Sequence, residues 1–481
     1  MLNVKMIGYI LGKIFLVEAA AMVLPAAVCL YYGESDVTAF AVIIAFLGIL
    51  GLVLVSNRPH NIAIYARDGL VTVALSWVML SLFGALPFFL SGAIPNYMDA
   101  VFETVSGFTT TGASILTDVE AMGRGLLFWR SFTHWLGGMG VLVFVMAVLP
   151  SSGGSSMHLM RAEVPGPTVG KLVSKMSDTA KILYGIYFGM TLIEIVMLLC
   201  GGMNLFDSCI NAFGSAGTGG FSNYALSIGH YNNLYFEIVI GTFCLLFGIN
   251  FNLFYFLLIG KVRDVLKSEE LRAYLGIVAA AVLLIAANIA QMYGSFWTGL
   301  RHAYFQVASI ITTTGYATTD FDLWPSFSKT ILLCLMVVGA SAGSTGGGLK
   351  VARVLLLMKG LRRNIRQMLK PRKVDVIRNN GQVVDEKILD NTNAYLAAYV
   401  VILFTVFLII SLDGFSVGTN FSAVLACFNN IGPGLEAVGP TCNFSAYSDL
   451  SKLVLSWAML AGRLEIFPIL VLFSRDTWRR R

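Results

Sequence analysis

The sequence predicts an all-α membrane protein in which four pseudo-symmetric repeats surround a central pore and two transmembrane helices precede the first repeat. Apolar runs long enough to cross a bilayer recur along the 481 residues, of which 57% are hydrophobic and only 12% charged. The mean hydropathy is +0.76. Four short glycine-containing segments also align with one another, and each follows an apolar stretch too short to span a membrane.

The first apolar run, residues 9–31, is expected to be a retained helix. It is longer than the hydrophobic part of a secretory signal, and its flanks carry no small-residue cleavage site. A second run covers residues 39–55. Because neither run leads into a glycine segment, residues 1–68 are expected to form two extra transmembrane helices outside the repeats.

Each repeat is expected to contain a spanning helix, a half-length helix, a glycine loop and a second spanning helix. The glycine segments are "TTTGAS", "AGTGGF", "TTTGYA" and "NNIGPG", and aligning them without gaps superimposes Gly112, Gly219, Gly315 and Gly432. The half-length helices are expected at residues 96–108, 205–215, 297–311 and 419–429. The spans are expected at residues 70–91 and 125–149, 182–201 and 235–259, 273–291 and 327–351, and 393–412 and 450–473. The repeats then occupy residues 69–160, 161–265, 266–370 and 371–481.

The distribution of charge predicts the orientation. Lys and Arg gather near both termini and between the repeats, most densely at residues 350–392, so the positive-inside rule makes those segments and both termini cytoplasmic. The chain crosses the membrane twice between successive glycine loops, so all four loops return to the same side, as in parallel rather than inverted repeats. Their acidic and poorly basic flanks place that side outside. The chain is expected to cross the membrane about ten times in all. The outer segments carry acidic residues such as Asp320 and Glu436, which concentrate cations at the outer face.

The four loops are predicted to line a cation pore. Irregular backbone is tolerated at membrane depth only where it is buried or lines water, and glycine lets a carbonyl turn inward. Rings of carbonyls replace the hydration shell of potassium, and the carboxyl ends of the half-length helices add negative potential. A single such loop is more simply a Gly/Thr turn between helices, but four aligned copies favour the pore.

At these loops the sequence resembles the ion-conducting subunit of the Trk/Ktr/HKT superfamily of potassium transporters, in its TrkH-like branch. The resemblance covers essentially the whole chain. It implies potassium uptake across the inner (plasma) membrane of a bacterium, with potassium bound at the filter and no organic cofactor. The implied filter residues are Thr110, Thr111, Gly112, Thr218, Gly219, Thr313, Thr314, Gly315, Asn430, Ile431 and Gly432. Because all four constriction positions are glycine, the resemblance favours potassium over sodium.

The second span of the third repeat is expected to be interrupted. Residues 327–340 are too short to cross alone and run into "SAGSTGGGLK", residues 341–350, where clustered glycines break a helix. The run lacks the Gly-Lys-Ser/Thr ending of a phosphate loop, and a packing notch for a close helix is the alternative. The resemblance implies an intramembrane gate formed by Gly343, Ser344, Thr345, Gly346, Gly347, Gly348, Lys350 and Arg463.

Arg463 is expected near the middle of the last span. An arginine there costs about 2.5–3.5 kcal/mol, so it should face a cavity or a partner, unless it snorkels from a tilted helix end. Glu465 is a poor partner because two residues of separation place it on another helix face. Our hypothesis is that Arg463 acts with the intramembrane gate as an electrostatic barrier. Arg130 and His134 also lie in a span, and neither is assigned a role.

The largest basic segment, residues 359–386, ends in two β-prone runs around an Asn-Gly pair, which predicts a small hairpin. The chain contains no nucleotide-binding domain. The resemblance therefore implies a TrkA-like cytoplasmic subunit as the nucleotide-binding regulatory partner, and a homodimer in the lipid membrane. No nucleic-acid partner is expected.

Two other classes of function remain as alternatives. An ion-coupled secondary transporter, such as a sodium- or proton-linked symporter, would need a polar site at the membrane midplane, and apart from Arg463 the spans offer few ionisable groups. A membrane enzyme would need a catalytic cluster. The five scattered histidines and seven cysteines without metal spacing predict that the chain is not an enzyme.

Overall fold

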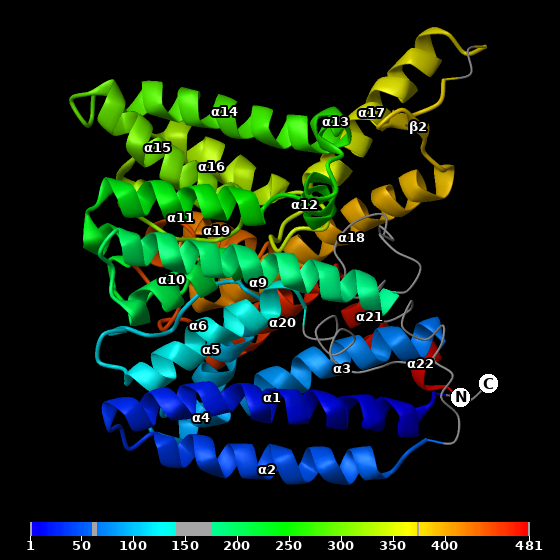
Figure 1. Ribbon diagram of the computed structural model, residues 1–481. Helices are drawn as coiled ribbons and strands as arrows, with labels where there is room; N and C mark the ends of the chain where they lie inside the picture. The colour runs from blue at the N-terminus through cyan, green and yellow to red at the C-terminus, as the bar shows by residue number, and fades with distance from the viewer. Residues whose placement is uncertain (1, 60–64, 141–175, 373–374, 480–481) are drawn as a thin grey trace.

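Long apolar helices run side by side through the molecule (Figure 1). The structure is a computed structural model that describes residues 2–59, 65–140, 176–372 and 375–479. In that part of the chain, six helices are long and apolar enough to cross a membrane, or seven if one bent pair is counted as a span. The six are α1 (Val4–Tyr32), α2 (Val37–Ser56), α3 (Ala66–Gly84) continued by α4 (Leu86–Leu90), α9 (Met176–Cys200), α14 (Glu269–Ile289) and α18 (Glu386–Ile410). The chain is a multi-pass membrane protein.

The four repeats are present, and α1 and α2 precede them. The long helices that open the repeats are α3, α9, α14 and α18. The half-length helices are α5 (Tyr97–Phe108), α10 (Leu205–Gly217), α15 (Phe296–Ile311) and α19 (Val417–Phe428), close to the predicted bounds. The second helices are α6 (Arg124–Gly138), α11 (Leu234–Phe247), α16 (Ser326–Val338) and α20 (Asp449–Arg463). The predicted boundary between the first two repeats, at residue 160, lies outside the described residues.

Side-chain caps fix where the half-length helices begin. Asn96, Asn204, Ser295 and Ser416 each precede a half-length helix, and each side-chain oxygen accepts a backbone N–H of the first turn. Asn and Ser are favoured at this position because they satisfy an N–H that has no partner within the helix. The short polar residues between apolar runs therefore set the starting points of all four.

The second helices are shorter than predicted. The predicted span at residues 235–259 is wrong as one helix: it is α11 and α12 (Phe251–Leu258), bent by 95°, with Asn250 capping the new start. The predicted span at residues 450–473 is also wrong, because α20 ends at Arg463 and α21 (Phe467–Phe473) follows a break at which Glu465 and Ile466 have positive φ. The interruption after α16 is confirmed. Beyond α6, the rest of the predicted span at residues 125–149 reaches outside the described residues.

α1 and α2 form an antiparallel pair beside the repeats (Figure 1). Gly12 and Gly51 meet where the helices cross: a Cβ on Gly12 would lie 3.0 Å from the Gly51 carbonyl oxygen, and one on Gly51 would lie 2.9 Å from that of Gly12. Small residues of this kind let two transmembrane helices approach closely. α1 also packs against α3 and α6.

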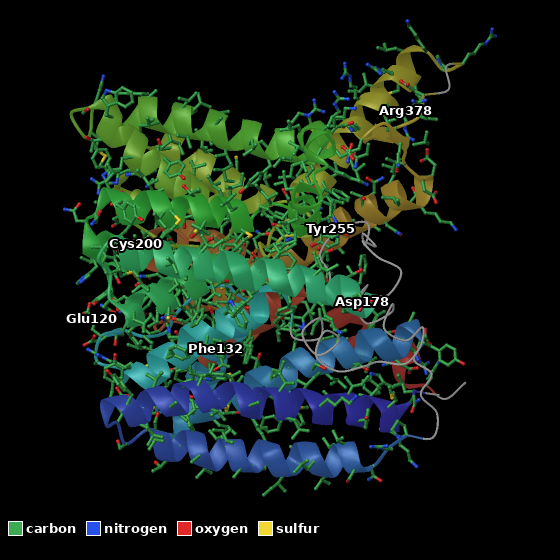
Figure 2. The ribbon with its side chains drawn as sticks, viewed as in Figure 1. Glu120, Phe132, Asp178, Cys200, Tyr255 and Arg378 are labelled. Atoms are coloured by element: carbon green, nitrogen blue, oxygen red, sulfur yellow. The ribbon has the colours of Figure 1, made fainter. Side chains whose placement is uncertain are left out.

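The basic elements gather at one end of the molecule. α17 (Val351–Leu369) projects there, as do the start of α1 and the short helix α22 (Arg475–Trp478), and α13 (Val262–Lys267) connects α12 to α14 (Figure 1). Figure 2 labels Asp178 and Arg378 toward this end and Glu120 and Cys200 at the other. Where the chain is described, its loops contain four short 3₁₀ turns: η1 (Ser227–Tyr231), η2 (Phe321–Leu323), η3 (Ser411–Asp413) and η4 (Glu436–Val438).

The predicted hairpin is confirmed. β1 (Arg378–Asn379) pairs antiparallel with β2 (Gln382–Val383). The turn residues Asn380 and Gly381 both have positive φ, 50° and 81°. Positive φ at both central residues is the geometry for which Asn-Gly is favoured.

Candidate functional site

Four loops follow the half-length helices and share one backbone conformation. They are loop 1 (residues 109–112), loop 2 (217–220), loop 3 (312–315) and loop 4 (429–432). The second residue of each loop is left-handed, with φ of 56°, 55°, 61° and 57° at Thr110, Thr218, Thr313 and Asn430. Its N–H donates to the carbonyl three residues earlier, and the next N–H donates to the carbonyl five residues earlier at 2.8 or 2.9 Å. This double bond pattern is the Schellman cap of a helix C-terminus.

Threonine is an unusual residue for a left-handed position. Glycine normally closes such a cap, and positive φ at a β-branched residue is a genuine outlier. Three of the four loops nevertheless place threonine there. Backbone strain of this kind persists where the surroundings enforce it, and it clusters at functional sites.

The loops contact one another in a closed ring through their fourth residues. Gly112, Gly220, Gly315 and Gly432 all have positive φ, between 74° and 95°. A Cβ on Gly112 would lie 2.0 Å from the carbonyl oxygen of Gly219, and one on Gly220 would lie 2.0 Å from that of Thr314. On Gly315 it would lie 2.0 Å from the oxygen of Ile431, and on Gly432, 2.8 Å from that of Thr111. Each loop therefore touches the next, and the backbone of all four surrounds one axis.

The ring corrects the predicted alignment of the second repeat by one residue. Thr218 occupies the left-handed position of Thr110, so Gly220, and not Gly219, is the counterpart of Gly112. Gly219 takes the third place, and its carbonyl oxygen faces Gly112. The ungapped alignment was wrong because loop 2 has two consecutive glycines, and matching letters do not reveal which of them has positive φ.

The threonine hydroxyls fasten the loops to their own helices and to each other. The Thr109 and Thr111 hydroxyls lie 2.8 Å apart, and so do those of Thr312 and Thr314. The first hydroxyl of each pair donates to the carbonyl four residues earlier, at 2.6 Å. Asn430 Nδ2 donates to Thr111 Oγ1 at 2.9 Å and joins loop 4 to loop 1. The side chains thus hold loops 1 and 3 to their own helices and join loop 4 to loop 1.

Residues to which the sequence assigned no role support loops 1 and 2. His134 Nδ1 lies 2.7 Å from the Gly107 carbonyl, which leaves Nε2 to accept the N–H of Phe221 at 3.2 Å. Arg130 forms a buried ion pair with Glu103 at 2.6 Å and donates to the Ser222 carbonyl at 3.0 Å. The sequence held one signal for this pair: a carboxylate in a half-length helix and an arginine in the helix that follows it.

The intramembrane loop, residues 339–350 between α16 and α17, lies against loops 3 and 4. The Gly347 N–H donates to Thr313 Oγ1 at 2.6 Å. A Cβ on Gly346 would lie 2.8 Å from the Thr312 carbonyl oxygen, and one on Gly347 would lie 2.2 Å from that of Asn429. Side chains at these two positions would collide with backbone, so only glycine lets the intramembrane loop come this close.

The other side of the intramembrane loop contacts the break between α11 and α12. Thr345 Oγ1 donates to the Phe247 carbonyl at 3.2 Å, and the Phe251 N–H donates to the Gly343 carbonyl at 3.0 Å. Ser344 bonds locally, to the Ser341 carbonyl, and Gly348 packs on Gly339 at the base of the loop. Of the predicted gate residues, Gly346 and Gly347 therefore contact loops 3 and 4, whereas the others brace the intramembrane loop.

The buried side chains of Arg463 and of Lys350, the last residue of the intramembrane loop, both donate to carbonyls of that loop. Arg463 is the last residue of α20, not the middle of a span, and its Nη1 donates to the Thr345 carbonyl at 2.7 Å. Its Nη2 donates to the carbonyls of Gly137 and Gly138, at the end of α6. Lys350 Nζ donates to the Gly346 carbonyl. Arg463 thus joins α20, α6 and the intramembrane loop, while Glu465 pairs with Arg353.

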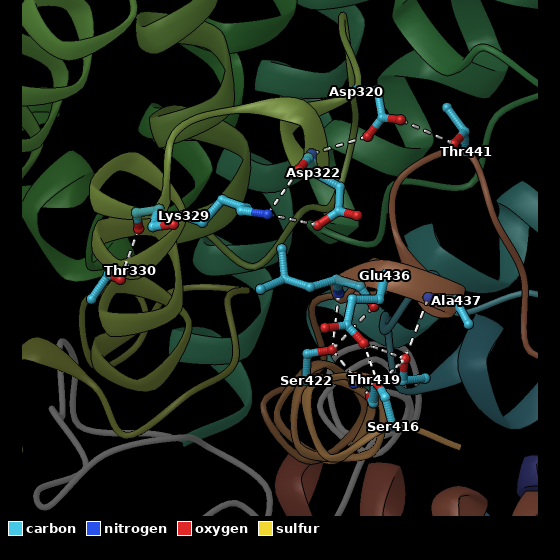
Figure 3. Close-up of polar contacts among 12 residues, drawn as sticks. Asp320, Asp322, Lys329, Thr330, Ser416, Thr419, Ser422, Glu436, Ala437 and Thr441 are labelled. Atoms are coloured by element: carbon cyan, nitrogen blue, oxygen red, sulfur yellow. Dashed lines mark hydrogen bonds and ion pairs between the residues drawn. The ribbon is translucent and has the colours of Figure 1, made fainter. Parts of the chain in front are cut away.

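Acidic side chains lie in the segments that follow loops 3 and 4 (Figure 3). The Glu436 carboxylate accepts bonds from the hydroxyls of Ser416 and Thr419, at the start of α19. The bond from Ser416, followed by that from Thr419, holds the pKa of Glu436 below its usual range. Asp320 lies 3.4 Å from the Thr441 hydroxyl, and Asp322 pairs with Lys329 at 3.5 Å. Carboxylates held by hydrogen bonds or an ion pair thus lie in the segments that follow loops 3 and 4 of the ring.

Comparisons with known proteins agree with the fold. A family model described as "TrkH: Cation transport protein" matches residues 36–479. The chain is 35% identical over 485 residues to the Trk system potassium uptake protein TrkH of Salmonella typhimurium, with 99% of this chain and 100% of that protein covered. The Escherichia coli K12 protein TrkG is 32% identical, with 99% of each covered. The crystal structure of the potassium transporter TrkH from Vibrio parahaemolyticus superimposes with a TM-score of 0.89 at 32% identity, covering 99% of this chain and 100% of that one.

Proposed function

This chain belongs to the TrkH family of cation transport proteins, and on that premise we propose that it takes up potassium through a pore whose filter is the ring formed by loops 1–4. The proposal rests on four equivalent contacts: the glycine in the fourth place of each loop lies against the carbonyl oxygen of the third residue of the next loop. The similar proteins are named as potassium uptake proteins or a potassium transporter. Transport, and not an enzymatic reaction, is the proposed activity.

The filter would work by replacing water with backbone oxygens. The half-length helices direct their carboxyl ends toward the loops, so their partial negative charge adds to that of the carbonyls. No carboxylate is required at the constriction, and the potassium ion is held as cargo. The proposed filter residues are those of the four loops, with Gly220 in the place first expected for Gly219.

The intramembrane loop is proposed to be the gate. Three contacts support this proposal: the bond from Gly347 to Thr313, the Arg463 bonds to the Thr345 carbonyl and to α6, and the Lys350 bond to Gly346. A loop held by a few bonds on one face of the ring can block it and can be released by movement of α17. The conformational change would be local because glycines supply its hinges.

The basic end of the molecule is proposed to be cytoplasmic and to dock a TrkA-like nucleotide-binding subunit. α17 continues directly from the intramembrane loop, and the hairpin packs near it through the Lys359 bonds to Glu269 and the Arg378 carbonyl. A partner that moves α17 would act on the gate. We place the protein in the inner membrane of a bacterium, with both termini cytoplasmic, as a homodimer.

Cation flux into liposomes tests this function. The purified protein and its Gly315→Ser variant would be assayed with potassium, rubidium, sodium and lithium in turn. We expect potassium and rubidium flux driven by membrane potential, with sodium excluded, and loss of that selectivity in the variant. Flux indifferent to Gly315, or no flux with and without the nucleotide-binding partner, would refute the filter.

The symporter alternative makes a different prediction in the same assay. A sodium- or proton-linked transporter would accumulate potassium only when a gradient of the coupling ion is imposed. A pore would follow the potassium diffusion potential alone. Clamping the pH and omitting sodium on both sides separates the two.

A further inference from the structure

α1 contributes to a cavity that the proposed transport pathway does not use. The cavity, of about 1210 Å³, lies where α1 meets the starts of α6 and α10. Leu24, Ala27, Val28 and Tyr31 line it from α1. These positions follow the i, i+3, i+4, i+7 spacing of one helix face. From Tyr31 to Leu24 the face runs about 10 Å along the helix, from the helix end toward the middle of the bilayer.

The end of the cavity nearest the helix termini is charged and aromatic. Arg124 opens α6, and its guanidinium lies 4.3 Å from the centroid of the Tyr32 ring and 5.8 Å from that of Phe206. In the part of the chain that the structure describes, no carboxylate or carbonyl accepts a bond from this guanidinium. The Arg124 side chain is exposed, and its N–H donors are accessible to an anion in the cavity.

Glu120 is a second charged group whose carboxylate can accept further hydrogen bonds. Figure 2 labels it at the end of the molecule opposite Arg378. Among the described residues, its carboxylate accepts one hydrogen bond, a weak one from the Ala225 N–H at 3.3 Å. The other carboxylates on the cavity wall are occupied: Glu34 accepts the first N–H groups of α6, and Asp207 accepts bonds from Asn204 and Asn223. A cation in the cavity would meet Glu120.

The lining thus combines an anion site, a cation site and an apolar strip. Arg124 and Glu120 both lie near Tyr224: the pKa of its phenol is raised chiefly by burial and by Asp207, with Glu120 raising it further and Arg124 lowering it. The apolar strip on α1 faces Leu127 and Leu205 across the cavity, and Leu205 is 62% exposed. Such a face is suited to acyl chains, since this end of each helix lies at the boundary of the bilayer.

We propose that this cavity binds a zwitterionic aminophospholipid, with its phosphate on Arg124, its ammonium on Glu120 and an acyl chain along the α1 face. A primary ammonium donates up to three hydrogen bonds, whereas a trimethylammonium donates none and a glycerol headgroup carries no cation. The site should therefore prefer phosphatidylethanolamine to phosphatidylcholine and phosphatidylglycerol. The site would give a role to α1, which contributes no loop to the proposed filter.

Native mass spectrometry of the full chain in detergent, titrated with each dioleoyl phospholipid, tests the proposal. We expect phosphatidylethanolamine to bind about tenfold or more tightly than the other two lipids, because one charge-assisted bond contributes about 1.5–3 kcal/mol. Arg124→Gln should weaken binding by about 10- to 100-fold, and Glu120→Gln should abolish the preference. Ala27→Trp should block the groove without changing charge. Arg58→Gln, which removes an exposed arginine at the far end of α2, is the matched control.

Three results would overturn the proposal. One is equal affinity of the native chain for the three lipids, and another is unchanged phosphatidylethanolamine binding in Ala27→Trp. The third is competition by O-phosphoethanolamine with the potency of the intact lipid, which would assign the site to a small soluble zwitterion. Because the readout is lipid binding and not cation flux, failure here leaves the proposed transport function intact.

Discussion

The Gly347 N–H donates a hydrogen bond of 2.6 Å to the Thr313 hydroxyl, and this bond joins the intramembrane loop to loop 3 of the ring. Both residues are buried or nearly so, and Thr313 holds the strained left-handed conformation that ends α15. The residue that shapes the backbone of loop 3 therefore also anchors the proposed gate. A change in the conformation of loop 3 should therefore alter the intramembrane loop, and the reverse.

Thr313→Val should release the intramembrane loop. Valine keeps the shape of threonine but removes the acceptor, so the Gly347 N–H is left buried and unpaired at a cost of about 1–3 kcal/mol. The equilibrium should then shift toward an open loop by about 5- to 150-fold, seen as higher potassium flux in the absence of the cytoplasmic partner. Thr313→Ser, which keeps the hydroxyl, is the control. Equal flux from both variants would mean that the bond does not hold the gate.

Arg463→Ala should raise the flux further, because it removes the donor shared by the Thr345, Gly137 and Gly138 carbonyls. Arg463→Lys keeps the charge but not the planar fork that reaches carbonyls on two elements. We expect the lysine variant to fall between native and alanine in single-channel open probability. If lysine behaves as native, charge alone suffices and the bonds do not matter. Unchanged conductance and open probability in the alanine variant would remove Arg463 from the gate.

The repeat pattern could be predicted from the sequence because its signals are local. Apolar run length separates spans from half-length helices, and glycine-rich segments mark the loops. The hairpin at Asn380-Gly381 could also be predicted, because both residues favour the positive φ that they adopt in the turn. The fold class and the interruption after α16 follow from such features.

The breaks in the second helices and the register of loop 2 could not be predicted in this way. Residues 235–259 are almost uninterruptedly apolar, and the 95° bend depends on Asn250 capping α12 and on tertiary bonds to the intramembrane loop. Ile466 has positive φ at the break between α20, which packs on α19 and α5, and α21, which packs on α3, and no local sequence signal predicts such a φ at isoleucine. Likewise, the supporting roles of His134 and Arg130 depend on partners far away in sequence.

Substitutions in loop 2 distinguish the corrected register from the original one. Gly220→Ala should destroy selectivity, because its Cβ would lie 2.0 Å from the Thr314 carbonyl oxygen, a backbone atom that no side-chain change can move. In Gly219→Ala the Cβ would meet the His134 ring, at 2.4 Å. Adding His134→Ala should therefore relieve part of the defect in Gly219→Ala and none of that in Gly220→Ala. Flux ratios of potassium to sodium for the four variants measure this coupling. Rescue of Gly220→Ala by His134→Ala would contradict the ring.

Breaking the Arg130–Glu103 pair should destabilise the protein strongly. Both side chains are almost fully buried, and loss of one partner leaves an unpaired buried charge, which costs about 3–5 kcal/mol. We expect Arg130→Met and Glu103→Leu each to lower the melting temperature more than the double variant does. Selectivity should also fall, because Glu103 accepts the Ile115 N–H beyond loop 1 and Arg130 holds the Ser222 carbonyl beyond loop 2. Additive effects in the two single variants would exclude coupling.

Glu436 should give the protein an acid-sensitive contribution to stability. The hydroxyls of Ser416 and Thr419 stabilise its carboxylate and lower its pKa in the folded state relative to the ordinary value of 4.5. A lowered pKa means that the stabilising contribution is complete above the unfolded value and is lost as the pH falls through the folded value. Glu436→Gln should therefore lower the melting temperature at pH 7 and converge with native as the pH falls through the lowered pKa of the folded state. Ser416→Ala removes the first hydroxyl. Its melting temperature should therefore change less than that of the native protein between pH 7 and acid pH. A constant gap between native and Glu436→Gln at every pH would mean that the carboxylate contributes nothing through its charge.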